Sequence, residues 1–344
     1  MKERILVTGG TGYIGSHTVV ELQLAGYEVI IIDNLSNSTI DSLAGIEKIT
    51  GIKPSFENLD CVDYVGLDYL FSKYEGIKAV IHFAASKAVG ESVQKPIVYY
   101  RNNVNGLMNI LDLMPIHGVQ NILFSSSCTV YGEPDILPVN ETAPTKPATS
   151  PYGNTKQICE EIIRDVIHSG AFMNSIILRY FNPIGAHPSA QIGELPIGVP
   201  SNLVPFITQT AIGIHSKLNV FGNDYNTPDG TCIRDYINVV DLAKAHVIAV
   251  KRMLDCVQDE PLEIFNIGTG RGVSVFELIQ AFETSNHVKV PYTVVERREG
   301  DIEKVWADPQ KANTILGWKA EISVEDTLKS AWNWEKRLHE TRKV

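Results

Sequence analysis

The sequence is short of cysteine and of long apolar runs, and each shortage removes a class of protein. Five cysteines stand at positions 61, 128, 159, 232 and 256, an odd number without a CxxC pair. We therefore expect neither a disulfide framework nor a metal site. No apolar run approaches the roughly 20 residues of a membrane helix, and the first residues leave no room for the apolar part of a signal peptide. We expect a reducing, cytoplasmic setting.

Positive charge is also scarce. The chain carries 30 Lys and Arg against 40 Asp and Glu, which gives a net charge of −10. A protein of this charge is not expected to bind nucleic acid or a membrane surface. An anionic ligand would instead need a few local cations.

The first half of the 344 residues alternates between apolar, strand-like runs and helix-like periodic segments. Fully apolar strands alternating with helices indicate a parallel sheet covered on both faces, which is the doubly wound, Rossmann-type α/β fold. The predicted strands are 4–8, 28–32, 53–57, 79–83, 121–125 and 174–179. The predicted helices are 13–25, 63–74, 96–117 and 152–169.

The composition and periodicity of the sequence change after residue 180. Residues 181–231 are rich in Gly, Pro and Asn, as in a binding surface. Strand-like runs return at 233–240 and 264–268, and helices are predicted at 273–283 and 324–337. We predict a cofactor-binding domain over 1–180, which 233–268 rejoins or borders, and a smaller substrate-binding lobe from 181–232 and 269–344.

A glycine-rich turn follows the first predicted strand and opens the first helix, with Gly9, Gly12 and Gly15 in a GxxGxxG pattern. Glycine allows positive φ and a close approach to a pyrophosphate, which the helix N-terminus then faces. Asp33 lies 21 residues past Gly12, where a carboxylate would bind ribose hydroxyls and repel a 2′-phosphate. The pattern favours NAD; the alternative is a structural turn with a solvated Asp33.

A possible catalytic group lies at the start of the helix at 152–169. Ser150 can cap this helix, and Tyr152 and Lys156 then share one face. A free phenol titrates near ~10, but a neighbouring ammonium and an oxidised nicotinamide would lower the pKa of Tyr152 and make it a general base. Ser127 ends a strand and can share the proton. The alternatives are a chance YxxxK spacing, a packing tyrosine and a serine loop.

These residues resemble the extended short-chain dehydrogenase/reductase superfamily. Within it, the UDP-galactose 4-epimerase family is similar from residue 5 to about 334. The strings that carry this resemblance include VTGGTGYIGSH at 7–17, KAVGES at 87–92, NNVNG at 102–106, RYFNP at 179–183, FGNDY at 221–225, RDYI at 234–237 and RREGD at 297–301.

The resemblance assigns cofactor contacts. Asp60 is expected at the adenine, Lys87 near the phosphates and Tyr180 beside the nicotinamide. Packing offers an alternative role for Phe83 and Tyr180, and surface charge for Lys87. The full expected set is Gly9, Gly12, Tyr13, Ile14, Gly15, Asp33, Asn34, Asp60, Phe83, Ala84, Lys87, Asn102, Tyr152, Lys156 and Tyr180.

The resemblance also implies a UDP-sugar substrate. Arg234 and Arg298 would be the local cations for its diphosphate, since guanidinium groups suit phosphate. The expected substrate contacts are Ser127, Asn182, Asn202, Leu203, Asn219, Phe221, Arg234, Arg298, Asp301 and Val305. Val305 stands where the family carries the residue nearest the 2-substituent of the sugar. The resemblance implies that a bulky Tyr at this position acts as a gate against N-acetylated sugars, whereas the smaller Val leaves room for them. N-acetylated sugars are therefore a further expected substrate; the alternative is that neighbouring side chains refill the space.

The implied activity is inversion of C4 through a 4-keto intermediate, with NAD regenerated in each cycle. A UDP-glucuronate epimerase or decarboxylase and a non-catalytic NAD sensor remain alternatives. A 4,6-dehydratase is disfavoured, because no acidic pair follows Ser127. The resemblance further implies a homodimer formed by helices 96–117 and 152–169, although packing on the sheet is an equally natural use for their apolar residues.

Overall fold

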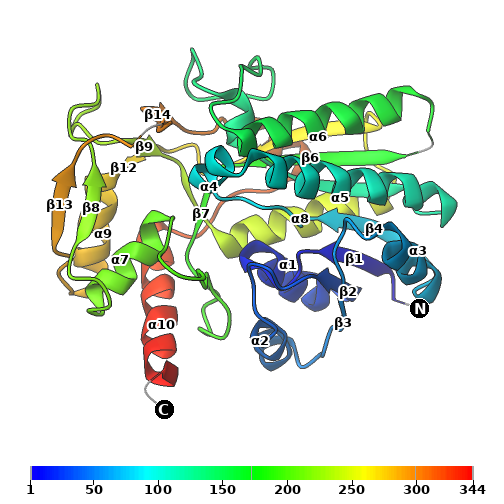
Figure 1. Ribbon diagram of the computed structural model, residues 1–344, viewed down its shortest axis with the longest axis horizontal. Helices are drawn as coiled ribbons and strands as arrows, with labels where there is room; N and C mark the ends of the chain where they lie inside the picture. The colour runs from blue at the N-terminus through cyan, green and yellow to red at the C-terminus, as the bar shows by residue number, and fades with distance from the viewer. Residues whose placement is uncertain (1, 172, 299, 343–344) are drawn as a thin grey trace.

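A parallel sheet of seven strands forms the centre of the larger lobe (Figure 1). The computed structural model describes residues 2–171, 173–298 and 300–342. The strand order is β11-β6-β5-β4-β1-β2-β3, so the predicted doubly wound fold is confirmed. The strands are β1 (Arg4–Thr8), β2 (Glu28–Asp33), β3 (Ser55–Asn58), β4 (Ile77–His82), β5 (Asn121–Ser127), β6 (Asn174–Tyr180) and β11 (Leu262–Ile267).

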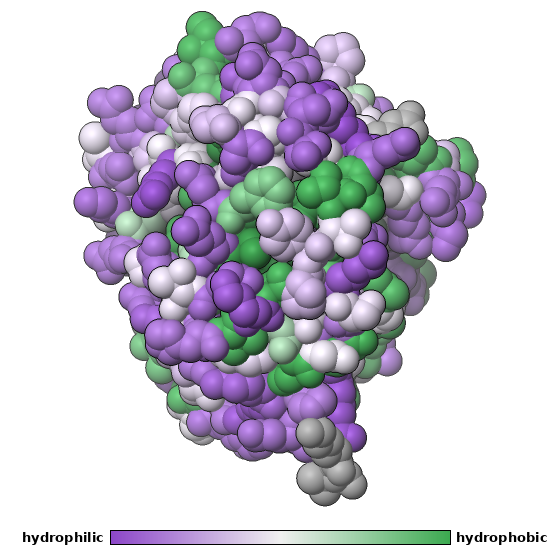
Figure 2. Space-filling model, turned by 90° about the vertical axis from the view of Figure 1, so that its left-hand side faces the viewer, coloured by the Kyte–Doolittle hydropathy of each residue, from purple (hydrophilic) through white to green (hydrophobic). Residues whose placement is uncertain are grey.

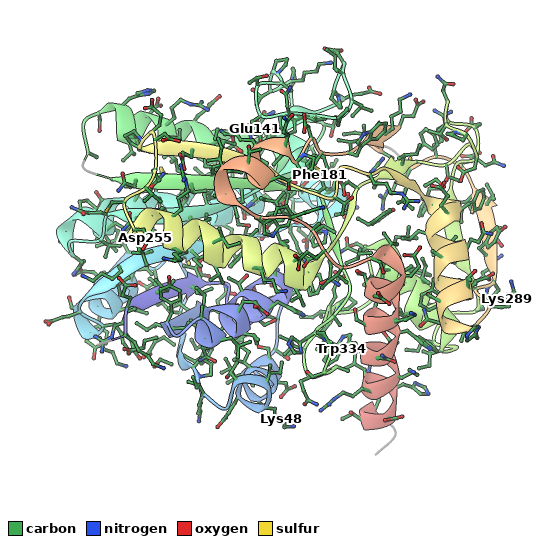
Figure 3. The ribbon with its side chains drawn as sticks, turned by 180° about the vertical axis from the view of Figure 1, so that it is seen from behind. Lys48, Glu141, Phe181, Asp255, Lys289 and Trp334 are labelled. Atoms are coloured by element: carbon green, nitrogen blue, oxygen red, sulfur yellow. The ribbon has the colours of Figure 1, made fainter. Side chains whose placement is uncertain are left out.

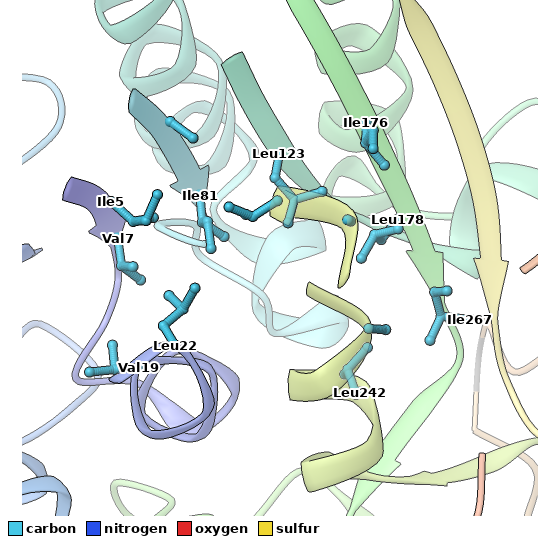
Figure 4. Close-up of a cluster of buried hydrophobic side chains, with 14 of the residues drawn as sticks. Ile5, Val7, Val19, Leu22, Ile81, Leu123, Ile176, Leu178, Leu242 and Ile267 are labelled. Carbon is cyan, nitrogen blue, oxygen red and sulfur yellow. The ribbon is translucent and has the colours of Figure 1, made fainter. Parts of the chain in front are cut away.

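Both faces of this sheet are buried, which explains why its strands are apolar at nearly every position. In β1, Leu6 enters one hydrophobic core, whereas Ile5 and Val7 enter the other. Figure 4 shows the second core, where Ile5 and Val7 lie with Leu22 and Ile81. Full burial of one such side chain contributes about 1.5–3 kcal/mol.

Helices cover the two faces in separate layers. One layer packs on the Leu6 side and consists of α3 (Tyr64–Lys73), α5 (Pro96–Ile116) and α6 (Pro151–His168). The other layer packs on the Ile5 side and consists of α1 (Tyr13–Leu24), α2 (Asp41–Thr50) and α8 (Val239–Leu254). The short helices α4 (Val89–Gln94) and η1 (Cys128–Tyr131) follow β4 and β5. The carboxyl ends of the strands are left for the loops that carry the candidate site.

The smaller lobe has its own core, in which Ile207, Leu278, Phe282 and Leu328 are fully buried. Its helices are α7 (Leu203–Ala211), α9 (Val275–Asn286) and α10 (Val324–Arg342), with a short π-helix, η2 (Ala312–Leu316), nearer the large sheet. Its strands are β7 (Asn182–Ile184), β8 (Leu218–Phe221), β9 (Ile233–Arg234), β10 (Tyr236–Asn238), β12 (Val273–Ser274), β13 (Tyr292–Val295) and β14 (Lys304–Val305). Figure 2 shows its outer face, which is mainly hydrophilic with separate apolar patches.

One predicted strand, at 233–240, is present as the two short strands β9 and β10, but it ends two residues earlier than predicted because its last two residues begin α8. The run at 233–240 reads as a strand because it is rich in β-branched residues, but α8 begins at Val239. The Asn238 side chain accepts the Val240 N–H at 2.7 Å and caps the helix. The helices α2, α4 and α7 also lie where no helix was predicted. Within the described part of the chain, no helix combines the length and apolar character needed to cross a membrane.

Candidate active site

The glycine turn between β1 and α1 is tightly closed. Gly9 has a φ of +68°, and a Cβ there would lie 2.9 Å from the backbone nitrogen of Ala84. A Cβ on Gly15 would lie 2.2 Å from the Gly9 carbonyl oxygen. Gly12 is the N-cap of α1 and offers no side-chain cap, so the Tyr13 and Ile14 end of the helix presents backbone N–H groups. This turn suits an anionic ligand.

Two acidic side chains lie beside the turn, at the ends of β2 and β3. Asp33 is buried and accepts the backbone N–H of Thr11 at 3.2 Å and that of Leu35 at 2.9 Å. Asn34 donates to Asp60 at 2.8 Å. Asp33 therefore shapes the turn as well as lending it negative charge.

The segment after β4 runs along the same edge of the sheet. The backbone N–H groups of Phe83 and Ala84 donate to Thr8, to its carbonyl and its hydroxyl, each at 3.1 Å. Asn102 donates to the Ser86 hydroxyl at 3.2 Å. Asn103 was not predicted as a site residue; its buried amide binds the backbone of Ser86 and the hydroxyl of Thr155 on α6. No sequence signal distinguishes it from Asn102.

Lys87 is not a free cation in this structure. Its ammonium lies 4.0 Å from a carboxylate oxygen of Glu194, which sequence reasoning did not single out. The same oxygen accepts the side-chain amide of Asn202 at 2.5 Å, and Trp334 on α10 donates to the Glu194 carbonyl at 2.8 Å (Figure 3). Glu194 thus joins a predicted phosphate contact, Lys87, to a predicted sugar contact, Asn202, across the two lobes.

The predicted catalytic group assembles at the end of β5. The Ser150 hydroxyl caps α6, accepting the Gly153 N–H at 3.2 Å, as predicted. Lys156 is buried, donates to the Ser125 carbonyl at 2.7 Å and lies 5.9 Å from the centroid of the Tyr152 ring. Ser127 is also buried, and its hydroxyl lies close enough to the Tyr152 phenol to lower the pKa of that group. A phenol, an ammonium and a hydroxyl therefore meet at one point.

The predicted lowering of the Tyr152 pKa is not produced by the protein groups. Burial raises the pKa of the Tyr152 phenol well above its ordinary value, the Tyr180 phenol raises it further, and the bond from Ser127 opposes both. Burial also lowers the pKa of Lys156 to about 8. Helix spacing correctly indicates that Tyr152 and Lys156 are neighbours, but it does not reveal how strongly their surroundings disfavour charge.

Two aromatic side chains border this group. The Tyr180 hydroxyl is hydrogen-bonded to Ser125, and the Phe83 ring packs 4.8 Å from the ring of His246 on α8. Tyr180 lies 6.0 Å from the same imidazole. His246 is fully buried, and burial lowers its pKa to about 4, so it is a neutral wall for this corner of the site.

The predicted substrate contacts at the start of the smaller lobe come from its first strand and helix. Asn182 lies in β7, and its backbone N–H donates to the Asp235 carbonyl at 2.9 Å. Asn202 is the N-cap residue of α7, and Leu203 is the first residue of that helix.

The other predicted contacts lie farther along the smaller lobe. Arg298 pairs with Asp301 at 2.7 Å, and its guanidinium carbon lies 5.5 Å from the centroid of the Phe221 ring. Asn219 and Phe221 are the two exposed residues of β8. Arg234 donates to the Ile233 carbonyl at 2.9 Å and bears no carboxylate partner among the ion pairs of the described residues. An aromatic face and two guanidinium groups suit a nucleotide diphosphate.

Val305 lies beside Arg234 in the small sheet, in the register of β14 with β9. It is only 3% exposed and packs in a cluster with Tyr131, Val139 and Phe181. The predicted gate residue is therefore part of a packed apolar wall, and its neighbours restrict how a larger side chain could be accommodated.

The chain is similar to known proteins over nearly its whole length. A family model described as GDP-mannose 4,6 dehydratase matches residues 6–331. The UDP-glucose 4-epimerase of Mus musculus is 49% identical over 341 residues, with 97% of each chain covered.

Two solved structures are similar over nearly the whole chain. The first is a UDP-glucose 4-epimerase from Stenotrophomonas maltophila with bound NAD and formylated UDP-arabinopyranose, with 46% identity, a TM-score of 0.95, and 98% of this chain and 99% of that one covered. The second is the enzyme from Bifidobacterium longum in complex with NAD⁺ and UDP, with 45% identity, a TM-score of 0.93, and 97% and 98% covered. The chain belongs to the UDP-glucose 4-epimerase family.

Proposed function

We propose that this enzyme interconverts UDP-glucose and UDP-galactose with NAD as its resident cofactor. The observation that carries the proposal is that Ser127, Tyr152 and Lys156 meet at the end of β5. The chain also has a tight glycine turn after β1 and two arginines on the smaller lobe. Each part matches one need of the reaction: a cofactor cradle, a proton-transfer group and a diphosphate anchor.

The residues at the glycine turn fit NAD. The uncapped start of α1 faces the pyrophosphate with N–H groups, and the buried carboxylate of Asp33 disfavours a 2′-phosphate. Asn34, Asp60, Lys87 and Asn102 would complete its contacts. When bound, oxidised NAD supplies a reversible acceptor for the hydride of the sugar C4 and a positive charge near the phenol.

Tyr152 would take the proton of the sugar 4-hydroxyl, and Ser127 would share it. Burial raises the pKa of Tyr152, so the phenolate needs nearby positive charge. Lys156 contributes an ammonium, which its bond to the Ser125 carbonyl holds in place. Proton transfer by a positioned group of this kind contributes about 10²–10⁴-fold to the rate.

The smaller lobe would hold the nucleotide part of the substrate. Arg234 and Arg298 would bind the diphosphate, and Phe221 would stack beside the base. Asn182, Asn202 and Leu203 would line the path to the sugar. Asn219 would contact the uracil and Asp301 the ribose. The 4-keto sugar can turn over only if these distant contacts hold the UDP while the ring is released.

Two finer points belong to the proposal. Val305 is smaller than an aromatic gate, so UDP-sugars with a 2-acetamido group are proposed as further substrates. A homodimer through α5 and α6 is also proposed, supported by the exposed apolar residues Ile97, Val98 and Met108 on α5. Light scattering that returns one chain mass at micromolar concentration would contradict the dimer.

The five free cysteines suit a reducing, cytoplasmic setting.

The test uses purified protein without added NAD. Incubation with UDP-galactose is expected to yield UDP-glucose, and denaturation is expected to release NAD. Absence of UDP-glucose from a preparation that contains NAD would overturn the epimerase proposal, and release of NADP would overturn the assignment of the cofactor through Asp33.

A further inference from the structure

The catalytic face of α6 continues one turn beyond Lys156. Tyr152, Lys156 and Glu160 are spaced four residues apart, so they follow one stripe of the helix. Glu160 is 3% exposed, as is Arg179 on β6, and the two form a bidentate ion pair. A buried pair of this kind is a poor source of net stability, because desolvation offsets its attraction. Its place beside the catalytic group calls for another explanation.

The pair is bonded directly to the strand that carries the catalytic serine. Ser126 donates to Glu160 at 2.5 Å and lies opposite Arg179 in the register of β5 with β6. Ser125 and Ser127, on either side of it, contact Lys156 and Tyr152 respectively. The end of β5 and the catalytic stripe of α6 are thus joined at three consecutive residues.

The Arg179 guanidinium also begins a series of hydrogen bonds that reaches the apolar wall beside Val305. Arg179 donates to the Tyr131 hydroxyl at 3.1 Å, which donates to Asn266 on β11 at 2.6 Å. Asn266 in turn donates to the Val139 carbonyl at 2.8 Å, and its backbone N–H donates to Glu141, labelled in Figure 3, at 2.7 Å.

This chain of bonds ends at the segment that carries the predicted gate. The Val139 N–H donates to the carbonyl of Trp306, the residue after Val305, at 2.9 Å. One continuous network of buried bonds therefore joins the proton-transfer group to the wall beside the sugar.

We propose that Glu160 and Arg179 are positioning residues, which fix the stripe of α6 against β5 so that Lys156 and Tyr152 keep their geometry beside Ser127. This rests on the proposed epimerase function. Neither residue touches substrate or cofactor in this role. A misplacement of about 1 Å in such a site costs about 10²-fold in rate.

The charge of Glu160 gives the proposal a distinctive signature. The groups around the Lys156 ammonium are Tyr152, Cys159 and Glu160 on α6 and His82 on β4. Burial lowers the Lys156 pKa, and Cys159 and Glu160 oppose it. Removing the negative charge of Glu160 leaves Arg179 uncompensated, so the pKa of Lys156 falls further below about 8. Removing Arg179 instead leaves the Glu160 carboxylate without its cation, which favours the charged form of Lys156 and so raises its pKa.

The test compares Glu160→Gln and Arg179→Met with wild type. For Glu160→Gln we expect about a 10²-fold loss in kcat, a KM close to wild type, and a loss of activity with rising pH that begins at a lower pH. The Lys156 pKa is measured separately by NMR of protein labelled at lysine Cε, assigned with Lys156→Met. It should move down in Glu160→Gln and up in Arg179→Met. This readout does not depend on epimerase activity, so it separates failure of this proposal from failure of the proposed function.

The chain offers a matched control. Arg252 and Glu263 form a second bidentate pair between α8 and β11, with side chains 12% and 7% exposed. The pair joins the end of α8 to the start of β11, away from the catalytic edge. Glu263→Gln should leave the Lys156 pKa and the pH profile unchanged.

If the pair has a mainly structural role, its loss loosens the site, and the Lys156 pKa should rise in both test variants. That result would overturn the proposal. An unshifted Lys156 pKa together with wild-type kcat would also overturn it. If Glu160→Gln does not fold, Ser126→Ala keeps both charges and removes one bond. It should lose kcat to a smaller extent with KM retained, and unchanged kcat in Ser126→Ala would then refute the proposal.

Discussion

The two lobes present polar side chains to the site in different ways. In the larger lobe, Ser127, Lys156 and Asp33 come from the ends of buried strands and from a long helix, and all three are buried. In the smaller lobe, Arg298 and Phe221 lie on short strands or loops and remain substantially exposed. Rigid elements suit chemistry that depends on exact distances, whereas exposed loops suit binding. Substitutions in the larger lobe should therefore reduce kcat, and those in the smaller lobe should raise KM.

The largest effect is expected from Tyr152→Phe. The substitution removes the proton-transfer group while retaining the ring, so kcat should fall by about 10²–10⁴-fold, with NAD retained and KM little changed. Steady-state kinetics and the extracted cofactor provide the measurement. Tyr64→Phe is the control, because its exposed phenol only binds Asp112 on the surface. Near-wild-type turnover in Tyr152→Phe would show that substitutions in the larger lobe do not act on kcat in the way proposed.

Arg298→Met should have a smaller effect, confined to binding. Loss of a hydrogen bond to a charged group costs about 1.5–3 kcal/mol, so KM for UDP-glucose should rise about 10- to 10²-fold while kcat stays close to wild type. The neighbouring Arg297 is a matched control, because it also pairs with an aspartate, Asp224, and lies over an aromatic ring, Tyr225. If Arg297→Met raises KM as much as Arg298→Met does, the loss of positive charge in this region explains the effect, and a specific contact of Arg298 does not.

The sequence predicted the larger lobe better than the smaller one, for a physical reason. Strands buried on both faces are apolar at nearly every position, so β1 was predicted with the ends that it has, Arg4–Thr8. The start of α6 was predicted from its cap, Ser150, and its first residue, Pro151. In contrast, α7 was not predicted, because the stretch around it is rich in Gly, Pro and Asn and shows little periodicity. Its N-cap residue, Asn202, makes no cap bond and instead binds Glu194.

Within the site, local spacing was readable and distant partners were not. The i, i+4 relation of Tyr152 and Lys156 predicted their proximity. The same spacing separates Lys156 from Glu160, but Glu160 was not predicted as a site residue. Only the fold reveals that Arg179 pairs with that carboxylate and that Ser126 donates a hydrogen bond to it. The opposing effect of burial on the pKa of Tyr152 was not predicted, because burial is a property of the assembled core.

The smallest effect is expected at Val305, where the two lobes meet, and it should concern one class of substrate. Val305 packs against Tyr131 and Phe181, so a larger side chain must displace them or extend toward the sugar. Overpacking costs about 1–3 kcal/mol. Wild type is expected to turn over UDP-GalNAc, and Val305→Tyr should reduce kcat/KM for that sugar by about 5- to 10²-fold while leaving UDP-galactose within a few-fold. Val305→Ile, which adds one carbon, is the graded control, and thermal unfolding checks that the cluster still packs. If wild type has no activity on UDP-GalNAc, the proposed range is wrong. If wild type and Val305→Tyr are equally active on UDP-GalNAc, Val305 does not select the sugar. Another residue of the same wall must then do so, and the residues of the network from Arg179 through Asn266 to Val139 should be substituted next.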